Sequence, residues 1–301
     1  LLIGLFISNV FSIPKWLKES LSSELFVKIG LVLLGTSVLF GDLLKAGSLG
    51  LIQSCVVVFT VWNFCFWLCR KMKIDKEMSL MLSSAVSICG VSAAVATAGA
   101  IKGDKKKLSY VVSLVLVVAV PMILIMPGLA KLMGLPEDMA GAWIGGTIDT
   151  TGAVAATGAI YGEVALQTST IVKFSQNVLL GVAAFLISIY WSYSKKEVAE
   201  EKPTLKVIWL RFPKFVLGFV AASVVFSFFV APEIVSEAKP ILKNIQGIWF
   251  ALAFMSIGLE TDFKSLITPE NRRSTYAFLG AQAFNVVFTL LVAWILFGLI
   301  A

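Results

Sequence analysis

An aspartate inside a run of small and apolar residues is the first residue of this sequence that could do chemistry. Asp149 lies among the hydroxyls of Thr147, Thr150 and Thr151. An ionisable group within a membrane segment is costly and indicates a functional site. We therefore predict that Asp149, Thr150 and Thr151 bind a coupling ion, H⁺ or Na⁺. The structural alternative is that Asp149 caps a helix N-terminus, where Asp is favoured.

A lysine lies deep in the apolar run that follows. Lys173 is about ten residues into this run, and Gln176 and Asn177 follow near one turn later. A lysine at that depth cannot easily extend its ammonium to the membrane surface. It could face an anionic substrate or form a buried pair with Asp149, and both alternatives stay open at this point.

Small polar residues precede a run of alanines and indicate the start of a half-helix. Such an N-terminus offers unpaired N–H groups and a positive dipole end, which attract anions. Cys89 is more simply explained as a small buried apolar residue than as a reactive thiol. The predicted substrate-binding residues are Ser87, Cys89, Gly90, Ser92, Gly146, Thr147 and Lys173.

One passage of the chain occurs twice. Residues 93–103 and 152–162 are identical at seven of eleven positions, at the constant offset that separates Gly103 from Gly162. Each copy follows glycines and polar residues that interrupt a membrane helix. Paired, Gly-interrupted hydrophobic segments indicate the substrate site of a transporter, whereas tight packing of two ordinary helices is the alternative. We predict two broken segments, at 77–102 and 139–161.

The composition identifies the class of protein. The 301 residues are 58% hydrophobic and 14% charged, with a mean hydropathy of +0.91, which excludes an ordinary soluble domain. The net charge of +7 comes from lysines and arginines in short loops, which specify membrane topology rather than nucleic-acid binding. Four cysteines show neither metal-ligand nor disulfide spacing, and the chain contains no His. We predict an all-α polytopic membrane protein.

The basic loops indicate how the broken segments lie. Basic clusters at 70–76 and 105–107 flank the first broken segment. They would fall on opposite faces if this segment crossed the membrane, and on one face if it were re-entrant. Because Lys and Arg concentrate on the cytoplasmic side, we predict re-entrant or strongly broken segments that enter from opposite faces. A discontinuous helix that crosses fully has the same appearance in sequence.

The remaining apolar runs predict the other helices, and a weak similarity relates two of them. The predicted helices lie at 25–44, 49–69, 108–132, 164–190, 207–230, 240–259 and 275–299. Residues 34–42 and 254–262 each contain a short polar stretch, then a short apolar stretch, and end in an Asp. This similarity indicates inverted repeats. Because the chain opens at Leu1 inside an apolar run, we expect an N-terminal portion before it. Residues 1–301 then form a single transmembrane domain.

The motif residues resemble a known family. Ser-Ile-Cys-Gly at 87–90 and Ile-Gly-Gly-Thr at 144–147, each followed by small residues, resemble the sulfate exporter (YeiH) family over essentially the whole chain. The resemblance implies a multi-pass carrier of the bacterial inner membrane. It also implies distant similarity to bile acid, arsenite and riboflavin transporters, which have inverted repeats.

Some polar positions differ from the family's pattern. After the Gly-Thr pair, the family usually has His, then Asp or Glu, and a Gln four residues after the His. This chain has Asp149, Thr150 and Ala153 at those positions. The family's Lys in the next helix matches Lys173, and Gln176 stands where an Arg is usual.

These observations together predict secondary transport of a small anion by alternating access. Sulfate or a related oxyanion is the substrate that the resemblance implies. The expected partners are this inorganic or organic anion, H⁺ or Na⁺, the lipid bilayer and a second copy in a homodimer, with no nucleic acid, cofactor or metal. The alternative is a channel-like or regulatory membrane subunit without coupled transport. Without His or a nucleophile–base pair we do not expect an enzyme.

Overall fold

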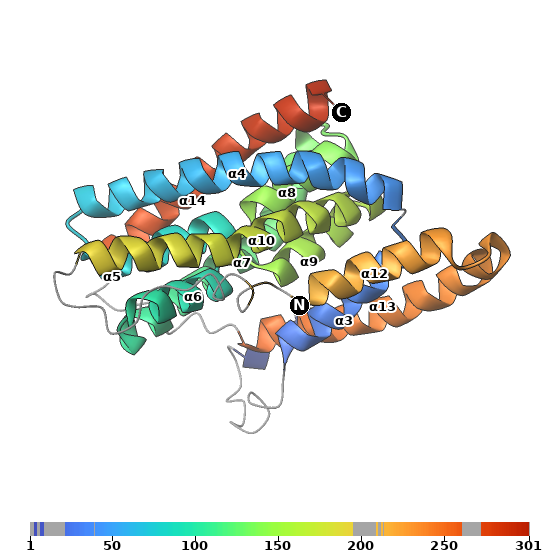
Figure 1. Ribbon diagram of the computed structural model, residues 1–301, viewed down its shortest axis with the longest axis horizontal. Coiled ribbons are helices and arrows are strands. Elements are labelled where there is room, and N and C mark those ends of the chain that lie inside the picture. Colours follow the sequence, from blue (N-terminus) through green and yellow to red (C-terminus); the bar gives the residue numbers. More distant parts are fainter. Residues whose placement is uncertain are drawn as a thin grey trace.

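The computed structural model describes residues 3–4, 7–8, 22–38, 40–194, 209, 212, 214–260 and 272–300. The described secondary structure is helical throughout, and most helices run along the long axis of the molecule (Figure 1). Five of these helices are long and apolar enough to cross a membrane: Leu43–Lys71, Lys105–Leu132, Glu163–Trp191, Glu233–Leu259 and Arg272–Ile300. The predicted all-α polytopic membrane class is confirmed.

The described elements follow one another in this order. They are α3 (Ser23–Gly35), α4 (Phe40–Lys71), α5 (Lys76–Ser84), the π-helical turn η1 (Ala85–Cys89), α6 (Val91–Ile101), α7 (Lys105–Leu132), α8 (Glu137–Thr147), α9 (Thr151–Tyr161), α10 (Glu163–Ser194), α12 (Phe215–Phe228), α13 (Pro232–Glu260), α14 (Arg272–Ala293) and the π-helical end η4 (Trp294–Ile300).

The single helix predicted at 25–44 is wrong, because the chain breaks between α3 and α4. The N–H and the hydroxyl of Thr36 both donate to Leu33 O, at 3.1 and 2.7 Å, which tightens the last turn and ends α3. Where α4 begins, the N–H of Phe40 donates to Ser227 Oγ of α12 at 3.0 Å. The polar residues near position 36 therefore mark a helix end, and α4 continues through the run predicted at 49–69.

The first broken segment is a helical hairpin that turns at Gly90. Helix α5 continues through η1, the chain reverses, and α6 leads away from the turn. Gly90 has φ +56° and ψ −110°, a backbone conformation that residues other than glycine rarely adopt. A Cβ at Gly90 would also lie 2.7 Å from Val115 Cγ1 of α7. Glycine is thus required for both the turn and the packing behind it.

Both ends of the first hairpin lie together. Lys107 Nζ forms ion pairs with Asp75 Oδ1 and Glu77 Oε2, each at 2.8 Å. These carboxylates belong to the start of α5, whereas Lys107 belongs to the first turn of α7. The first hairpin therefore enters and leaves at one end of the bundle, which is the re-entrant arrangement favoured by the distribution of basic loops.

Helices α8 and α9 form the second hairpin around an extended break. Ile148 has the extended backbone conformation (ψ 133°), and α8 ends before it. At the base, Glu137 Oε2 accepts hydrogen bonds from the backbone N–H groups of Val164 and Ala165, at 2.9 and 3.3 Å. The start of α8 therefore lies beside the start of α10, and this hairpin is re-entrant too.

The two hairpins enter from opposite ends of the bundle. Helix α7 joins their bases, and its 28 residues span about 42 Å at 1.5 Å per residue. The hairpin tips meet between these ends, because a Cβ on Gly90 would lie 3.2 Å from Asp149 O. The re-entry from opposite sides therefore brings the predicted site segments into contact.

The bases of the hairpins are closed by equivalent contacts. In each, a glutamate near the start of the first half-helix accepts a hydrogen bond from a backbone N–H 27 residues later: Glu77 from Asp104, and Glu137 from Val164. The two copies of the repeated sequence therefore both end at the base of a hairpin. An inverted repeat over the whole chain stays a prediction, because residues 39 and 261–271 lie outside the described part.

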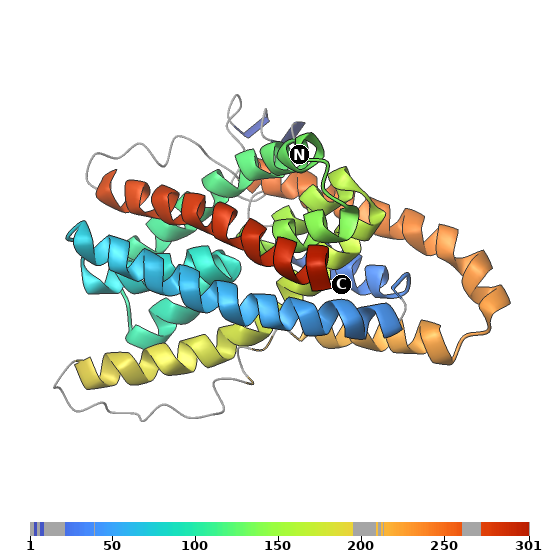
Figure 2. The ribbon, with the colours of Figure 1, turned by 90° about the horizontal axis from the view of Figure 1, so that it is seen from above.

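Helix α10 is the axis of the fold. Of its most apolar stretch 67% is buried, compared with 28–33% for the other four long helices. Helices α12 and α13 both pack against α3 in a second core, in which Leu31 and Phe219 are fully buried. They lie toward the right of Figure 2. Helix α9 of the second hairpin contacts both α10 and this group, through α3 and α13.

The topology gives a first prediction. Lys73→Cys and Lys106→Cys, in a background without the four native cysteines, should be labelled by a membrane-impermeant thiol reagent from the same face. Lys131→Cys, at the other end of α7, should be labelled from the opposite face. Labelling of Lys73→Cys and Lys106→Cys from different faces would contradict the re-entrant first hairpin.

The ion pairs at the base of the first hairpin give a second prediction. Burial raises the pKa of Asp75, but hydrogen bonds from Lys107 and the Met78 N–H outweigh it, so the pKa lies below the usual value. A lowered native pKa contributes stability above the unfolded-state pKa of about 3.9, and this contribution is lost as the pH falls through the native pKa.

Lys107→Met should therefore lower the free energy of unfolding at pH 7 by about 0.2–1 kcal/mol, the range measured for exposed ion pairs. The difference from the unaltered protein should shrink below about pH 4. Denaturant unfolding at both pH values measures it, with the exposed Lys106→Met as the matched control. Equal effects of the two substitutions at pH 7 would show that these ion pairs do not hold the hairpin base.

Candidate functional site

The broken helices leave backbone carbonyls without helical partners, and polar side chains supply the missing hydrogen bonds. At the end of the first half-helix, Lys173 Nζ donates to Ile88 O at 2.7 Å, and Asn285 Nδ2 donates to Val86 O at 3.2 Å. An unpaired buried carbonyl is costly in a medium without water. Lys173 and Asn285 thus stabilise the broken end of the first hairpin.

The second hairpin also receives hydrogen bonds from three full-length helices. Gln53 of α4 donates to Ala142 O at 2.8 Å, and Gln176 of α10 donates to Gly146 O at 3.0 Å. From α14, Gln282 and Asn285 both donate to Thr147 O, at 3.0 and 3.1 Å. Gln282 and Asn285 thus form hydrogen bonds between α14 and the end of α8. Gln53 was missed, although an amide within an apolar run is the signal that could have identified it.

Lys173 lies behind the hairpin tips rather than on an open surface. Its side chain is buried, and besides Ile88 O it donates to Gln176 Oε1 at 2.8 Å. It is not among the residues that line the large cavity described below. Its geometry is that of a cap on a half-helix C-terminus, where a cation also complements the helix dipole.

The N-terminal ends of the second half-helices face a cavity of about 790 Å³. Ser92 lies in the first turn of α6, and Thr150 and Thr151 lie at the start of α9. These residues line the cavity together with Cys89 and Asn177. We call these five side chains the polar floor. Two helix N-termini thus meet the same open space.

The cavity extends from the polar floor toward the end of the bundle that holds the base of the first hairpin. Val95 of α6 and Val112 of α7 line it, and both helices lead to that base. Lys28 and Glu24 of α3 also line it and form an ion pair at 2.6 Å, with side chains 38% and 72% exposed. They mark the mouth. The cavity therefore opens on the side predicted to be cytoplasmic.

The structure divides the predicted site residues into two groups. Cys89, Ser92, Thr150 and Thr151 line the cavity. Ser87 instead donates its hydroxyl to Ser83 O of its own helix at 2.7 Å. The other predicted residues that the structure places outside the cavity lining are Gly90, Gly146, Thr147, Asp149 and Lys173.

Gly146 allows close packing rather than providing an open surface. A Cβ there would contact Gln53 Nε2 and lie 2.7 Å from Thr289 Cγ2. The space beside Gly146 is therefore filled by the side chains that support the second hairpin. Gly146 does not line the cavity, and its role in substrate binding stays a prediction.

Asp149 is buried at the tip of the second hairpin without a hydrogen-bond partner for either carboxylate oxygen. The cap of α9 is Thr150, whose Oγ1 accepts from the Ala153 N–H at 3.2 Å. The alternative that Asp149 caps this helix is therefore wrong. Among the described residues it forms no ion pair, and Lys173 is bonded elsewhere. The hydroxyl of Thr147 is also buried and unpartnered.

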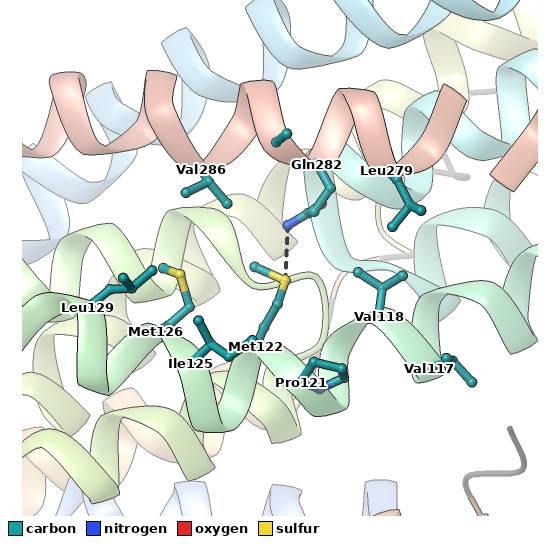
Figure 3. A pocket seen from close by; sticks show the side chains of 11 residues that line it. Val117, Val118, Pro121, Met122, Ile125, Met126, Leu129, Leu279, Gln282 and Val286 are labelled. Carbon is teal, nitrogen blue, oxygen red and sulfur yellow. Dashed lines mark hydrogen bonds between the residues drawn. The ribbon is translucent and has the colours of Figure 1, made fainter. Parts of the chain in front are cut away.

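A second, smaller pocket is apolar and lies between α7 and α14. It has a volume of about 410 Å³, and Figure 3 shows Met122, Ile125 and Leu279 among its walls. Gln282 points across it, and Gln282 Nε2 lies 3.3 Å from Met122 Sδ. Because this amide also supports Thr147, the pocket offers no free donor for an anion. The floor of the larger cavity is the candidate site.

Comparisons with known proteins agree with the fold. The model of a family described as conserved hypothetical protein 698 matches residues 1–277. A UPF0324 membrane protein of Rhodopirellula baltica is 40% identical over the whole chain, which covers 57% of that protein. One from Nitratidesulfovibrio vulgaris is 38% identical over the whole chain, which covers 54% of it. A UPF0324 membrane protein of Nitrosomonas europaea is 31% identical, and the match covers 88% of this chain and 61% of that protein.

The chain spans little more than half the length of the first two of these relatives. No solved structure matches. The family match covers most of the chain, and the relatives are described as membrane proteins, in agreement with the five long apolar helices. The chain belongs to the family of conserved hypothetical protein 698, a family of membrane proteins.

Proposed function

We propose that the protein is a secondary active transporter of a small anion that moves past the hairpin tips by alternating access. The supporting observation is an asymmetry between the two ends of the broken helices. Carbonyls at the C-terminal ends are paired by Lys173 and by amides, while the N-terminal ends at Ser92 and Thr151 line the cavity. A helix N-terminus carries a positive partial charge and unpaired N–H groups, so the cavity floor favours an anion.

Asp149 is proposed to bind the coupling ion. A buried carboxylate without a partner is strongly unfavourable unless a proton or a cation neutralises it. Its backbone lies against Gly90 of the other hairpin, so a change in its charge acts directly where the tips meet. Binding of H⁺ or Na⁺ at Asp149 would then favour one arrangement of the tips over the other, which is what coupling requires.

Sulfate or a related oxyanion is the proposed substrate, and the bacterial inner membrane is the proposed location. The relatives come from bacteria and are described only as membrane proteins. An oxyanion head group accepts hydrogen bonds from hydroxyls and from backbone N–H groups, which are the donors at the polar floor. Saturable counterflow in proteoliposomes would separate this carrier from a channel-like subunit.

A third prediction tests the anion site at the start of α6. Ser92→Asp adds a carboxylate where the helix dipole favours it, so the protein should still fold and purify. The same charge should repel a bound anion, and counterflow of labelled sulfate or a small carboxylate should fall at least tenfold. Ser92→Asn, similar in size and uncharged, is the matched control. Undiminished counterflow in Ser92→Asp would overturn the proposed site.

A fourth prediction tests the coupling role of Asp149. Asp149→Asn keeps the size and removes the charge, so transport should lose its dependence on the Na⁺ or pH gradient while counterflow continues. Asp138→Asn makes the same change at the outer end of the second hairpin, where Asp138 Oδ1 accepts the Met139 N–H. This control should keep the gradient dependence. Intact gradient coupling in Asp149→Asn would contradict the coupling role.

A further inference from the structure

The larger cavity has two chemically different parts. The polar floor, formed by Cys89, Ser92, Thr150, Thr151 and Asn177, occupies the end at the hairpin tips. The side chains above it are largely apolar and come from α3, α6, α7, α10 and α13. We call the apolar wall the set Val27, Val95, Val112, Leu116, Leu180 and Ile257.

The size of the cavity exceeds what a bare inorganic anion needs. Its volume of about 790 Å³ corresponds to on the order of 25 water molecules at about 30 Å³ each. It lies within the range of about 300–1,000 Å³ that is typical of sites for drug-sized molecules. An apolar wall of this extent gains nothing from contact with a hydrated ion but favours contact with hydrocarbon.

The charges around the cavity favour a single negative charge. The lysines among its described lining residues, Lys28 and Lys214, lie at the starts of α3 and α12, and Lys28 is paired with Glu24. Lys173 is bonded to Ile88 O and Gln176. The floor therefore offers hydroxyls and two dipole ends but no full positive charge. A dehydrated dianion requires cationic partners, whereas one charge spread over an oxyanion head is matched by such donors.

Asn177 independently indicates a ligand at the floor. The residue is 4% exposed, its Oδ1 is buried without a partner, and its Nδ2 donates to Thr151 Oγ1 at 3.2 Å. Because a hydroxyl both donates and accepts, the amide can reverse and leave either its oxygen or its NH₂ for a ligand. A polar head at the floor would satisfy this group, and a hydrocarbon chain would not.

We infer that the substrate is an amphipathic organic monoanion, with a carboxylate or sulfonate head at the polar floor and an apolar body along the apolar wall. The inference rests on the proposed anion transport, and it replaces sulfate, the substrate that the resemblance implies, with a singly charged organic oxyanion. Burial of hydrocarbon supplies binding free energy that the floor alone lacks, about 0.8 kcal/mol per methylene. That amount corresponds to about fourfold in affinity per methylene at full burial.

A chain-length series tests the inference on the full chain in lipid nanodiscs or proteoliposomes. The probes are acetate, butanoate, hexanoate and octanoate, the matching alkanesulfonates, and sulfate, as competitors for counterflow of labelled hexanoate. The half-inhibitory concentration should fall about two- to fourfold per added methylene up to hexanoate. Sulfate should compete at least tenfold more weakly than hexanesulfonate. Hexylammonium, which has the same chain and the opposite charge, should not compete.

Two variants separate the wall from the floor. Val95→Thr replaces a methyl group on the cavity side of α6 with a hydroxyl, at a residue that is 42% exposed. It should weaken hexanoate several-fold and leave acetate unchanged. Ser92→Asp should weaken every anion of the series alike.

The outcomes distinguish this inference from the proposed function. Transport of sulfate, together with inhibition by carboxylates and sulfonates that does not depend on their chain length, would overturn the amphipathic substrate. It would leave the proposed anion transport in place. If Val95→Thr shows the same chain-length dependence as the unaltered protein, that dependence arises from partition of the anions into lipid and not from the apolar wall. This result would also overturn the inference. If no anion is transported and Ser92→Asp changes nothing, the proposed function itself fails.

Discussion

Hydrogen bonding of backbone groups at the two helix breaks is the constraint on which the rest of the structure depends. In a bilayer no water is present to satisfy a carbonyl that has lost its helical partner. Gln176, Asn285 and Lys173 each donate to such a carbonyl, from α10 and α14, and Gln53 of α4 donates to Ala142 O inside α8. These helices are thereby fixed against the hairpins. Burying a polar side chain in a membrane costs free energy. The side chain is nevertheless stabilising when it donates a hydrogen bond to a backbone carbonyl that would otherwise be buried without a partner.

The same constraint explains why the site is open at one kind of helix end. The C-terminal ends are filled by amides and an ammonium, so their negative partial charges are compensated. At the N-terminal ends, Ser92 of α6 and Thr151 of α9 line the cavity, and Thr150 accepts a hydrogen bond from the Ala153 N–H. Under the proposed function, selectivity for an anion would follow from which helix ends are paired and which line the cavity. The buried carboxylate of Asp149 stands just outside this open space, at the contact between the hairpins.

Much of the fold could be predicted from the sequence, because its signals are local. Apolar runs predicted the long helices, and glycine-rich interruptions predicted the breaks. The basic loops favoured re-entry, and the ion pairs of Lys107 place the two ends of the first hairpin together. The site was harder to predict, because its side chains form hydrogen bonds with residues that are distant in the sequence. Nothing local shows that Lys173 caps Ile88, that Gln53 supports α8, or that Asn177 faces the cavity. The break near Thr36 was missed because its partner is a serine of α12.

The closing glutamates at Glu77 and Glu137 have a consequence for how such a molecule can originate. Each hairpin returns to the face where it began, and the helix that follows it, α7 or α10, crosses once. A unit of one hairpin and one helix therefore makes an odd number of crossings. When such a unit is copied in tandem, parity alone turns the second copy upside down. A single duplication of about sixty residues, the separation of Glu77 from Glu137, is enough to place two opposed hairpins in one membrane.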